Sequence, residues 1–111
     1  EITEFTVAPQ VAPGDGSLPY HEWYVEFVNS PADLNSFSMK VDKTLQRLNS
    51  YYFDLVEGKV LQPLIMHSLK KDAFRDYMKS KGKLGGQNKV PRLSNDRLIA
   101  DELDEMLSRN E

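Results

Sequence analysis

The residues best suited to chemistry form one short stretch near the end of the chain, Gly85-Gly86-Gln87-Asn88-Lys89-Val90-Pro91-Arg92. Two adjacent glycines let successive backbone N–H groups converge on an anion, and Lys89 and Arg92 bring positive charge to the same place. This combination has the chemistry of a phosphate contact, but the spacing alone does not select that interpretation. The stretch lacks the Gly-Lys-Ser/Thr of the nucleotide phosphate loop and the three spaced glycines of the dinucleotide fingerprint. An exposed basic loop with no ligand therefore stays open as the alternative.

The charge distribution singles out the same part of the chain. The formal net charge is −3, but residues 67–92 contain eight Lys or Arg against two Asp or Glu, and both flanking segments are acidic. The negative total argues against a surface built to attract nucleic acid. The aromatic residues interleaved in this segment, Phe74 and Tyr77, have the spacing of a helix core face. We therefore expect no nucleic-acid partner.

Other residues that could carry chemistry have ordinary explanations. His21 and His67 have no second ligand at metal-binding spacing, so each is interpreted as a strand residue with a satisfied hydrogen bond, and no metal site is expected. Glu22 and Glu26 share one face of a strand, which is interpreted as a solvated face rather than an acid–base pair.

Length and composition limit the protein class. With 111 residues and a mass of 12.7 kDa, the chain has room for one domain, which we place at residues 4–108. It contains no cysteine, so disulfides, thiolate metal sites and thiol nucleophiles are excluded. Neither a signal peptide nor an apolar run of the roughly 18 residues that span a bilayer is present. We expect a cytoplasmic protein without a membrane partner.

The first half of the chain predicts two strands and a long helix. Alternation predicts strands at residues 4–7 and 21–28, the second with Trp23, Val25 and Phe27 on one face. The prolines and glycines of residues 9–19, which include Pro9, predict a loop between the two strands. Ser30 as N-cap, Pro31 and Asp33 then begin a helix. Its apolar stripe, which runs to Gly58, predicts one helix over 31–57 and consists of Leu34, Phe37, Val41, Leu45, Leu48, Tyr52 and Leu55.

The second half predicts a third strand and two shorter helices. The strand is expected in the second half of 60–69, with Pro63 at its entry or on an edge. A short amphipathic helix at 71–81 is followed by a loop at 82–93. A last helix, capped by Ser94 or Asn95, turns inward Ile99, Leu103, Met106 and Leu107.

These elements predict the fold class. The order is β-β-α-β-α-α, in which the first two strands form a hairpin and the long helix crosses over to the third strand. We expect an α+β fold with a small mixed sheet, three-stranded or slightly larger, whose helices can cover one face.

Three segments resemble a known family. Residues 20–27 (YHEWYVEF), 73–82 (AFRDYMKSKG) and 87–94 (QNKVPRLS) look like the C-terminal domain of the Gretchen Hagen auxin-responsive promoter family, and the resemblance runs from about Glu4 to Leu107. Its members are acyl-acid amido synthetases of the adenylate-forming superfamily. A Gly-Lys-Leu-Gly-Gly-Gln stretch ahead of Lys-Val-Pro-Arg is typical of the bacterial branch.

The resemblance implies that this chain is the mobile lid of a larger enzyme whose N-terminal domain binds ATP, Mg and the carboxylic acid. The acid would attack the α-phosphate of ATP to give an acyl-adenylate and pyrophosphate, and an amine such as an amino acid would then displace AMP. The expected partners are the N-terminal domain of the same protein and the small carboxylic acid and amine substrates. The fragment alone is expected to be inactive.

The resemblance also implies roles for the basic stretch. Lys89 matches the lysine of the family's Lys-x-Pro-Arg motif and would contact the phosphates. Arg92 would contact the nucleotide or hold the loop. Gln87 and Asn88 would orient the loop, and Gly85 and Gly86 would permit its shape. The plant pattern has Asn-Gln-Tyr before the lysine, whereas Gly86, Gln87 and Asn88 stand here, so a role for that tyrosine does not carry over.

Two alternatives remain beside this interpretation. Lys89 and Arg92 could only hold the loop against the acidic last helix, through Asp101 or Glu105. The whole chain could also be a stand-alone interaction or regulatory module without catalysis. A start codon at Glu1 would favour the module, and a coding sequence for an ATP-binding domain upstream of Glu1 would favour the ligase.

Overall fold

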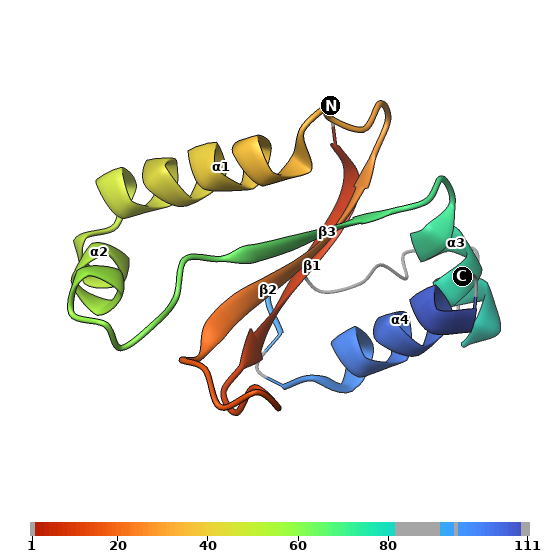
Figure 1. Cartoon of the computed structure of the whole chain (residues 1–111). Coiled ribbons are helices and arrows are strands. Elements are labelled where there is room, and N and C mark those ends of the chain that lie inside the picture. Colours follow the sequence, from red (N-terminus) through yellow and green to blue (C-terminus); the bar gives the residue numbers. More distant parts are fainter. Residues whose placement is uncertain (1, 82–91, 95, 110–111) are drawn as a thin grey trace.

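The computed structural model describes residues 2–81, 92–94 and 96–109. The strands are β1 (Ile2–Gln10), β2 (Tyr20–Phe27) and β3 (Ile65–Leu69), and the helices are α1 (Leu34–Leu48), α2 (Ser50–Glu57), α3 (Ala73–Ser80) and α4 (Leu98–Arg109). The order among the described residues is thus β-β-α-α-β-α-α (Figure 1). The predicted α+β class is confirmed.

The three strands form one mixed sheet in the order β1-β2-β3. β2 pairs antiparallel with β1 and parallel with β3. A parallel pair requires a crossover connection, and α1 with α2 supplies it. The predicted hairpin, the crossover and the third strand after Pro63 are all present.

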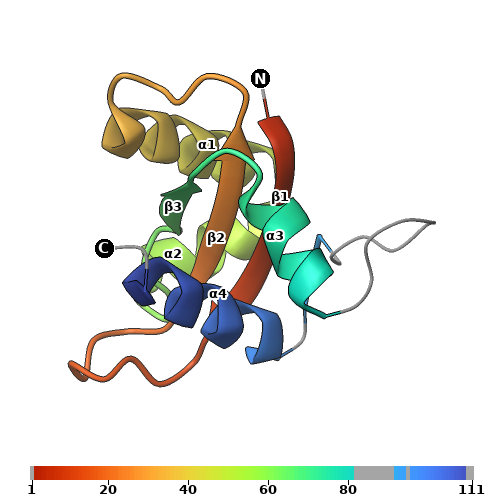
Figure 2. The same cartoon turned by 90° about the vertical axis from the view of Figure 1, so that its right-hand side faces the viewer.

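Helices cover both faces of this sheet, as Figures 1 and 2 show. On one face, β2 residues Val25 and Phe27 pack with Met66 of β3 and with the apolar side chains of α1. On the other face, Tyr24 packs with α3 and α4, whose buried residues include Phe74 and Leu103. The prediction that helices cover one face was too limited, because α3 and α4 lie together on the second face.

The single helix predicted over 31–57 is wrong at both its start and its middle. It begins at Leu34, because the N-cap is Asp33, whose carboxylate accepts the N–H of Ser36 at 3.1 Å, rather than Ser30. The chain then breaks at Asn49, whose φ of −136° and ψ of 99° are extended. Leu48, predicted on the apolar stripe, is 75% exposed as a result.

Asn49 serves both helices at this corner. Its backbone N–H donates to the carbonyl of Leu45 to end α1, and its side-chain oxygen accepts the N–H of Tyr52 at 3.1 Å to begin α2. The turn brings the Tyr52 hydroxyl onto the buried carboxylate of Asp42, which also accepts the backbone N–H of Leu64 at 3.0 Å. This carboxylate joins α1, α2 and the entry to β3, and a continuous helix could not make these contacts.

β1 is longer than predicted and includes Pro9, which was assigned to the loop. Pro9 pairs with His21 in the β1–β2 register. An edge strand tolerates proline where the missing N–H would point away from the neighbouring strand, and β1 is an edge strand.

The two helices on the second face are present as predicted but begin later than expected, and the side chain of Leu107, predicted to face inward, lies outside what the structure describes. In α3, Phe74 and Tyr77 are buried as expected. α4 begins at Leu98, whose N–H donates to the Asp96 carboxylate at 3.0 Å. Ser94 is not the cap, because it lies four residues before Leu98 and its N–H donates to the carbonyl of Val7 at 2.9 Å; Asn95, the other predicted cap, lies outside the described residues.

Candidate functional site

Most of the predicted site lies outside the described residues. This applies to Gly85, Gly86, Gln87, Asn88 and Lys89. Arg92 is described, as are the residues on which its segment is anchored. The structure therefore shows how the two ends of the predicted phosphate loop are attached to the domain.

Arg92 attaches one end of the loop to the edge of the sheet. The N–H of Val7 donates to the Arg92 carbonyl at 3.0 Å, and Leu93 forms a parallel bridge with Val7. The Arg92 side chain, 62% exposed, contacts the Glu4 carboxylate at 3.3 Å, and its guanidinium lies 5.1 Å from the centre of the Phe5 ring. Arg92 thus contacts β1, whereas Asp101 of α4 pairs with Arg97.

Lys81 attaches the other end to α4. Its ammonium group contacts the Glu102 carboxylate, which also accepts the Tyr77 hydroxyl at 2.8 Å. The hydrogen bond from Lys81, followed by that from Tyr77, lowers the pKa of Glu102. Burial, reinforced by the Glu102 hydrogen bond, raises the pKa of Tyr77 to about 12. Each end of the loop is therefore held by a carboxylate from a different element.

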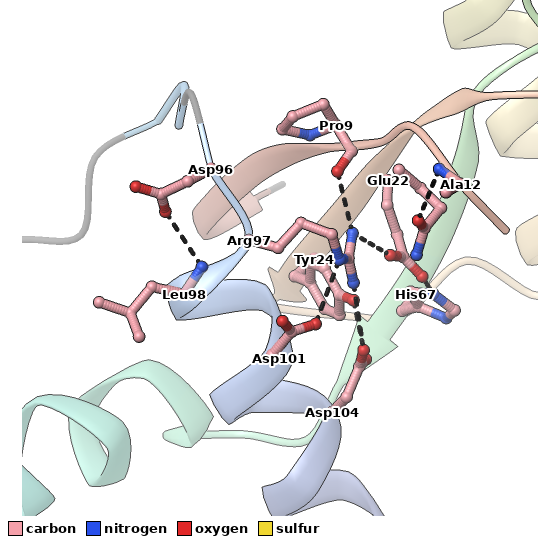
Figure 3. A network of polar contacts seen from close by, with 11 residues as sticks. Pro9, Ala12, Glu22, Tyr24, His67, Asp96, Arg97, Leu98, Asp101 and Asp104 are labelled. Carbon is pink, nitrogen blue, oxygen red and sulfur yellow. Dashed lines mark hydrogen bonds and ion pairs between the residues drawn. The ribbon is translucent and has the colours of Figure 1, made fainter. Parts of the chain in front are cut away.

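Arg97 is the centre of a polar network between α4 and the sheet (Figure 3). Its Nε contacts Asp101 at 3.1 Å, and Nη2 contacts Asp104 at 3.4 Å. Nη1 donates to the carbonyl of Pro9 at 3.2 Å and lies 2.9 Å from Oε1 of Glu22. One guanidinium, 18% exposed, thereby joins β1, β2 and the first turns of α4.

Glu22 and Tyr24 form the buried side of this network. The other Glu22 oxygen lies 2.6 Å from Nε2 of His67, and the Tyr24 hydroxyl donates to Asp104 at 2.7 Å. Burial acts to raise the pKa of Glu22, but the His67 hydrogen bond, the Tyr24 hydroxyl and the Arg97 charge outweigh it, so that pKa is lowered. Burial, with the bond to Asp104, raises the pKa of Tyr24.

The network is sealed rather than open to a ligand. Glu22 is 6% exposed and Tyr24 is fully buried. A substrate could not reach the carboxylate without displacing α4. The arrangement suits a structural task, holding the start of α4, and therefore the chain that follows Arg92, against the sheet.

These contacts correct one prediction and confirm another. Glu22 and Glu26 are not solvated: Glu26 is 5% exposed and accepts the N–H groups of Asp72 at 2.9 Å and Phe74 at 3.2 Å, so it caps the start of α3. The prediction that His67 is a hydrogen-bonded strand residue is confirmed. His21 lies 5.8 Å from the Tyr52 ring, and burial lowers its pKa.

Sequence reasoning missed Arg97 as a key residue. The available signal was its isolation: among residues 93–108 it is the only Lys or Arg, in a segment that contains five Asp or Glu. An isolated cation at the start of an acidic helix indicates a specific partner, yet its buried partner Glu22 is distant in sequence and could not be identified by spacing.

Within the described part of the chain, no group of three His, Asp or Glu side chains could hold a metal ion. The helices described there are also too short or too polar to cross a membrane.

Comparisons with known proteins identify the family. No curated protein sequence matches the chain. Among solved structures, the GH3.15 acyl acid amido synthetase is similar with a TM-score of 0.67 and 19% identity; the match covers 97% of this chain but 19% of that one. That likeness shows the fold. The model of the GH3 family C-terminal domain matches residues 1–98. The chain therefore belongs to the GH3 family, the Gretchen Hagen family that the sequence resembles, as its C-terminal domain.

Proposed function

We propose that this chain is the C-terminal domain of an ATP-dependent acyl acid amido synthetase, and that it brings Lys89 to the phosphates of ATP. The family match over residues 1–98 carries the proposal, because it includes the whole Lys-Val-Pro-Arg motif. The structural relative is named an acyl acid amido synthetase, and this chain spans about a fifth of its length. The main substrate sites would then lie in an N-terminal domain of the same protein.

The proposed reaction has two steps. A carboxylate oxygen of the acid attacks the α-phosphorus of ATP, the bond to the bridging oxygen breaks, and pyrophosphate leaves. The amine nitrogen then attacks the acyl carbon, AMP leaves, and an amide forms with loss of a proton from nitrogen. Negative charge builds on the phosphates during the first step. A lysine placed there stabilises that charge more in the transition state than in the ground state.

Lys89 is the residue we assign to this contact. An ammonium group on a long flexible stem suits a charge that moves during the reaction. Arg92 would support it by fixing the loop, an interpretation favoured by the contacts of Arg92 with Glu4 and Phe5. Gln87 and Asn88 would orient the loop, and Gly85 and Gly86 would allow its backbone to approach the phosphates.

ATP and Mg²⁺ would be bound mainly outside this chain. The candidate phosphate contacts here are cationic or backbone donors, which suit phosphate oxygens and not a metal ion. The Gly-Lys-Leu-Gly-Gly-Gln stretch at 82–87 is the reason to place the protein in a bacterial branch of the family, which stays a prediction.

The proposal is tested with Lys89→Ala in the full-length protein, by ATP–pyrophosphate exchange with a panel of carboxylic acids. Loss of one preorganised contact should lower exchange by on the order of 10²–10³. Lys83→Ala is the matched control, because it removes a lysine from the same segment but outside the Lys-x-Pro-Arg motif, and it should retain most activity. An exchange rate that is unchanged in Lys89→Ala refutes the phosphate role.

A further inference from the structure

The two edges of the sheet differ in how their backbone groups are used. β1 and β3 are the edge strands. An edge strand with free N–H and C=O groups can pair with another chain, and proteins usually block such edges. One edge here is blocked along most of its length, and the other is not.

The β1 edge is closed by three devices. The N–H and C=O of Val7 bond to Arg92 and Ser94 of residues 92–94, which we call the closing segment. The N–H of Phe5 donates to the Glu4 carboxylate at 3.0 Å. Pro9 has no N–H, and its carbonyl accepts from Arg97. Little remains on this edge for another strand to bond.

No backbone hydrogen bond from another described segment closes the outer edge of β3 in this way. Among the described residues, its only backbone ladder is the one with β2. Its sequence, Ile-Met-His-Ser-Leu, contains no Asp, Glu, Lys, Arg or Pro, the residues that commonly protect an edge. The Ser30 and Ser68 hydroxyls lie 3.4 Å apart, and this contact uses no backbone group of β3.

The register shows which backbone groups are free. The backbone N–H and C=O of Val7 point away from β2, since they bond to the closing segment. Val7 and Trp23 are therefore a non-hydrogen-bonded pair, and the backbone N–H and C=O groups of Trp23 and Val25 point toward β3. In a parallel pair, a residue bonds to the residues on either side of the one directly opposite it. Met66 lies opposite Trp23 and Ser68 lies opposite Val25, so neither Met66 nor Ser68 bonds to β2. The N–H and C=O groups of Met66 and Ser68 therefore point out of the sheet.

We propose that β3 pairs antiparallel with β3 of a second copy of this chain, about a two-fold axis at His67. Met66 then lies opposite Ser68 of the second copy, and Ser68 opposite Met66 of the second copy. Each pair exchanges two backbone hydrogen bonds, so four form in all. His67 lies opposite His67 of the second copy, and these two residues form the non-hydrogen-bonded pair between the two hydrogen-bonded pairs.

Charge and side-chain pattern favour a second copy in this register. Ile65 lies opposite Leu69 of the second copy, and because Leu69 is 4% exposed and packs in the core of its own copy, the pairing places no charged side chain against Ile65. Lys70 and Lys71 follow β3 directly. If the two β3 strands paired parallel and in register, each lysine would lie beside the same lysine of the second copy. In the antiparallel pairing the equivalent lysines are separated by about 20 Å, beyond the ~8 Å Debye length at physiological salt.

The dimer should be weak. A stable interface buries about 800 Å² on each partner, and one five-residue strand pair buries less than that. We expect a Kd on the order of 0.1–1 mM for the 111-residue chain, by comparison with interfaces of standard size.

Sedimentation velocity from about 10 µM to 1 mM, the range that brackets the expected Kd, tests the proposal. Ser68→Pro removes an outward N–H while keeping the bonds to β2, and should weaken dimerisation about tenfold or more, since two hydrogen bonds are lost. Ser68→Ala is the matched control: it removes the same hydroxyl, keeps the N–H, and should dimerise like the parent. Circular dichroism at low concentration checks that each variant is folded.

Two further measurements hold even if Ser68→Pro does not fold. In amide NMR spectra of the unmodified chain, shifts on dilution should be confined to β3 and its flanks. Because the chain has no cysteine, His67→Cys should oxidise to a disulfide dimer, whereas Ile65→Cys should not, since its two copies would lie about 14 Å apart. A chain that stays monomeric, shifts centred elsewhere such as Leu48 and Tyr51, or preferential cross-linking at 65 each overturns the proposal.

Discussion

Replacing Arg97 with Met would test whether the network between α4 and the sheet is a structural anchor. Methionine keeps much of the apolar stem of arginine and removes the guanidinium. The change takes away the donor to the Pro9 carbonyl and the ion pairs with Glu22, Asp101 and Asp104. Glu22 is 6% exposed, and its remaining close partners are His67 and the Tyr24 hydroxyl.

The expected cost follows from that burial. Removing one partner of a buried ion pair typically costs about 3–5 kcal/mol, because the other charge is left uncompensated. Arg97 is 18% exposed and His67 still contacts Glu22, so the lower end, about 3 kcal/mol, applies. For a domain of this size that corresponds to a Tm lower by roughly 13 °C.

The assay is urea unfolding of the 111-residue chain followed by circular dichroism. The double variant Arg97→Met/Glu22→Gln removes both charges, and should regain at least half of the lost free energy, since no unpaired carboxylate stays buried. Arg92→Met is the matched control: that ion pair is 62% exposed on the arginine side and should cost less than about 1 kcal/mol.

Two results would refute this reasoning. If Arg97→Met unfolds at nearly the same urea concentration as the parent, the guanidinium contributes no net stability. If the double variant is as unstable as Arg97→Met, the loss comes from packing and not from an uncompensated charge on Glu22.

The same network predicts a pH dependence, and the α1–α2 corner predicts a second large effect. The pKa of Glu22 is held below the ordinary value of 4.5, so the folded state binds a proton on Glu22 more weakly than the unfolded state does. The contribution of ionised Glu22 to the free energy of unfolding is therefore complete above pH 4.5 and is lost as the pH falls through the lowered pKa. Urea unfolding between pH 7 and pH 3 should show a shallower loss in Glu22→Gln than in the parent, and equal slopes would contradict the assignment. Asp42→Ala should cost about 3 kcal/mol, because it leaves the donors of Tyr52, Gln46 and Leu64 unpaired in a site where Asp42 is 3% exposed. Asp54→Ala, an exposed change on α2, should stay within about 0.5 kcal/mol, and an equal effect of the two variants would disprove the corner's role.

Sequence patterns predicted the elements well where one face is apolar. The alternation around Trp23, Val25 and Phe27 identified β2, and the spacing of Phe74 and Tyr77 identified α3, because a buried face imposes its own period. The same logic failed on the second face of β2. Glu22 and Glu26 look solvated in sequence, but their charges are compensated by Arg97 and by the N–H groups at the start of α3. Such partners are supplied by distant segments.

The break at Asn49 was hidden for a related reason. The apolar spacing continues from Leu45 to Tyr52, so periodicity favours one helix. The extended backbone of Asn49 is stabilised by its two caps and by the contact of Tyr52 with Asp42. Asparagine is a strong N-cap residue, which was the local signal, but only the tertiary contact decides that the cap is used.

Most of the described cations of residues 67–92 have no ion pair with another described residue. Of these cations, Lys81 and Arg92 pair with Glu102 and Glu4. Lys70, Lys71, Arg75 and Lys79 are exposed and have no ion pair among the described residues. On α4, Asp101 and Asp104 pair with Arg97, and Glu102 pairs with Lys81.

This division of charge favours an anionic ligand near α3. Cations that are not neutralised by neighbours raise the local concentration of a polyanion and its rate of encounter. The effect extends over about a Debye length, ~8 Å at physiological salt, so it acts on a phosphate group that approaches α3. Lys81 and Arg92, which precede and follow residues 82–91, are held by their ion pairs, and the four unpaired cations supply the positive potential. Positive potential of this kind is the electrostatic condition that the proposed contact of this domain with a triphosphate would require.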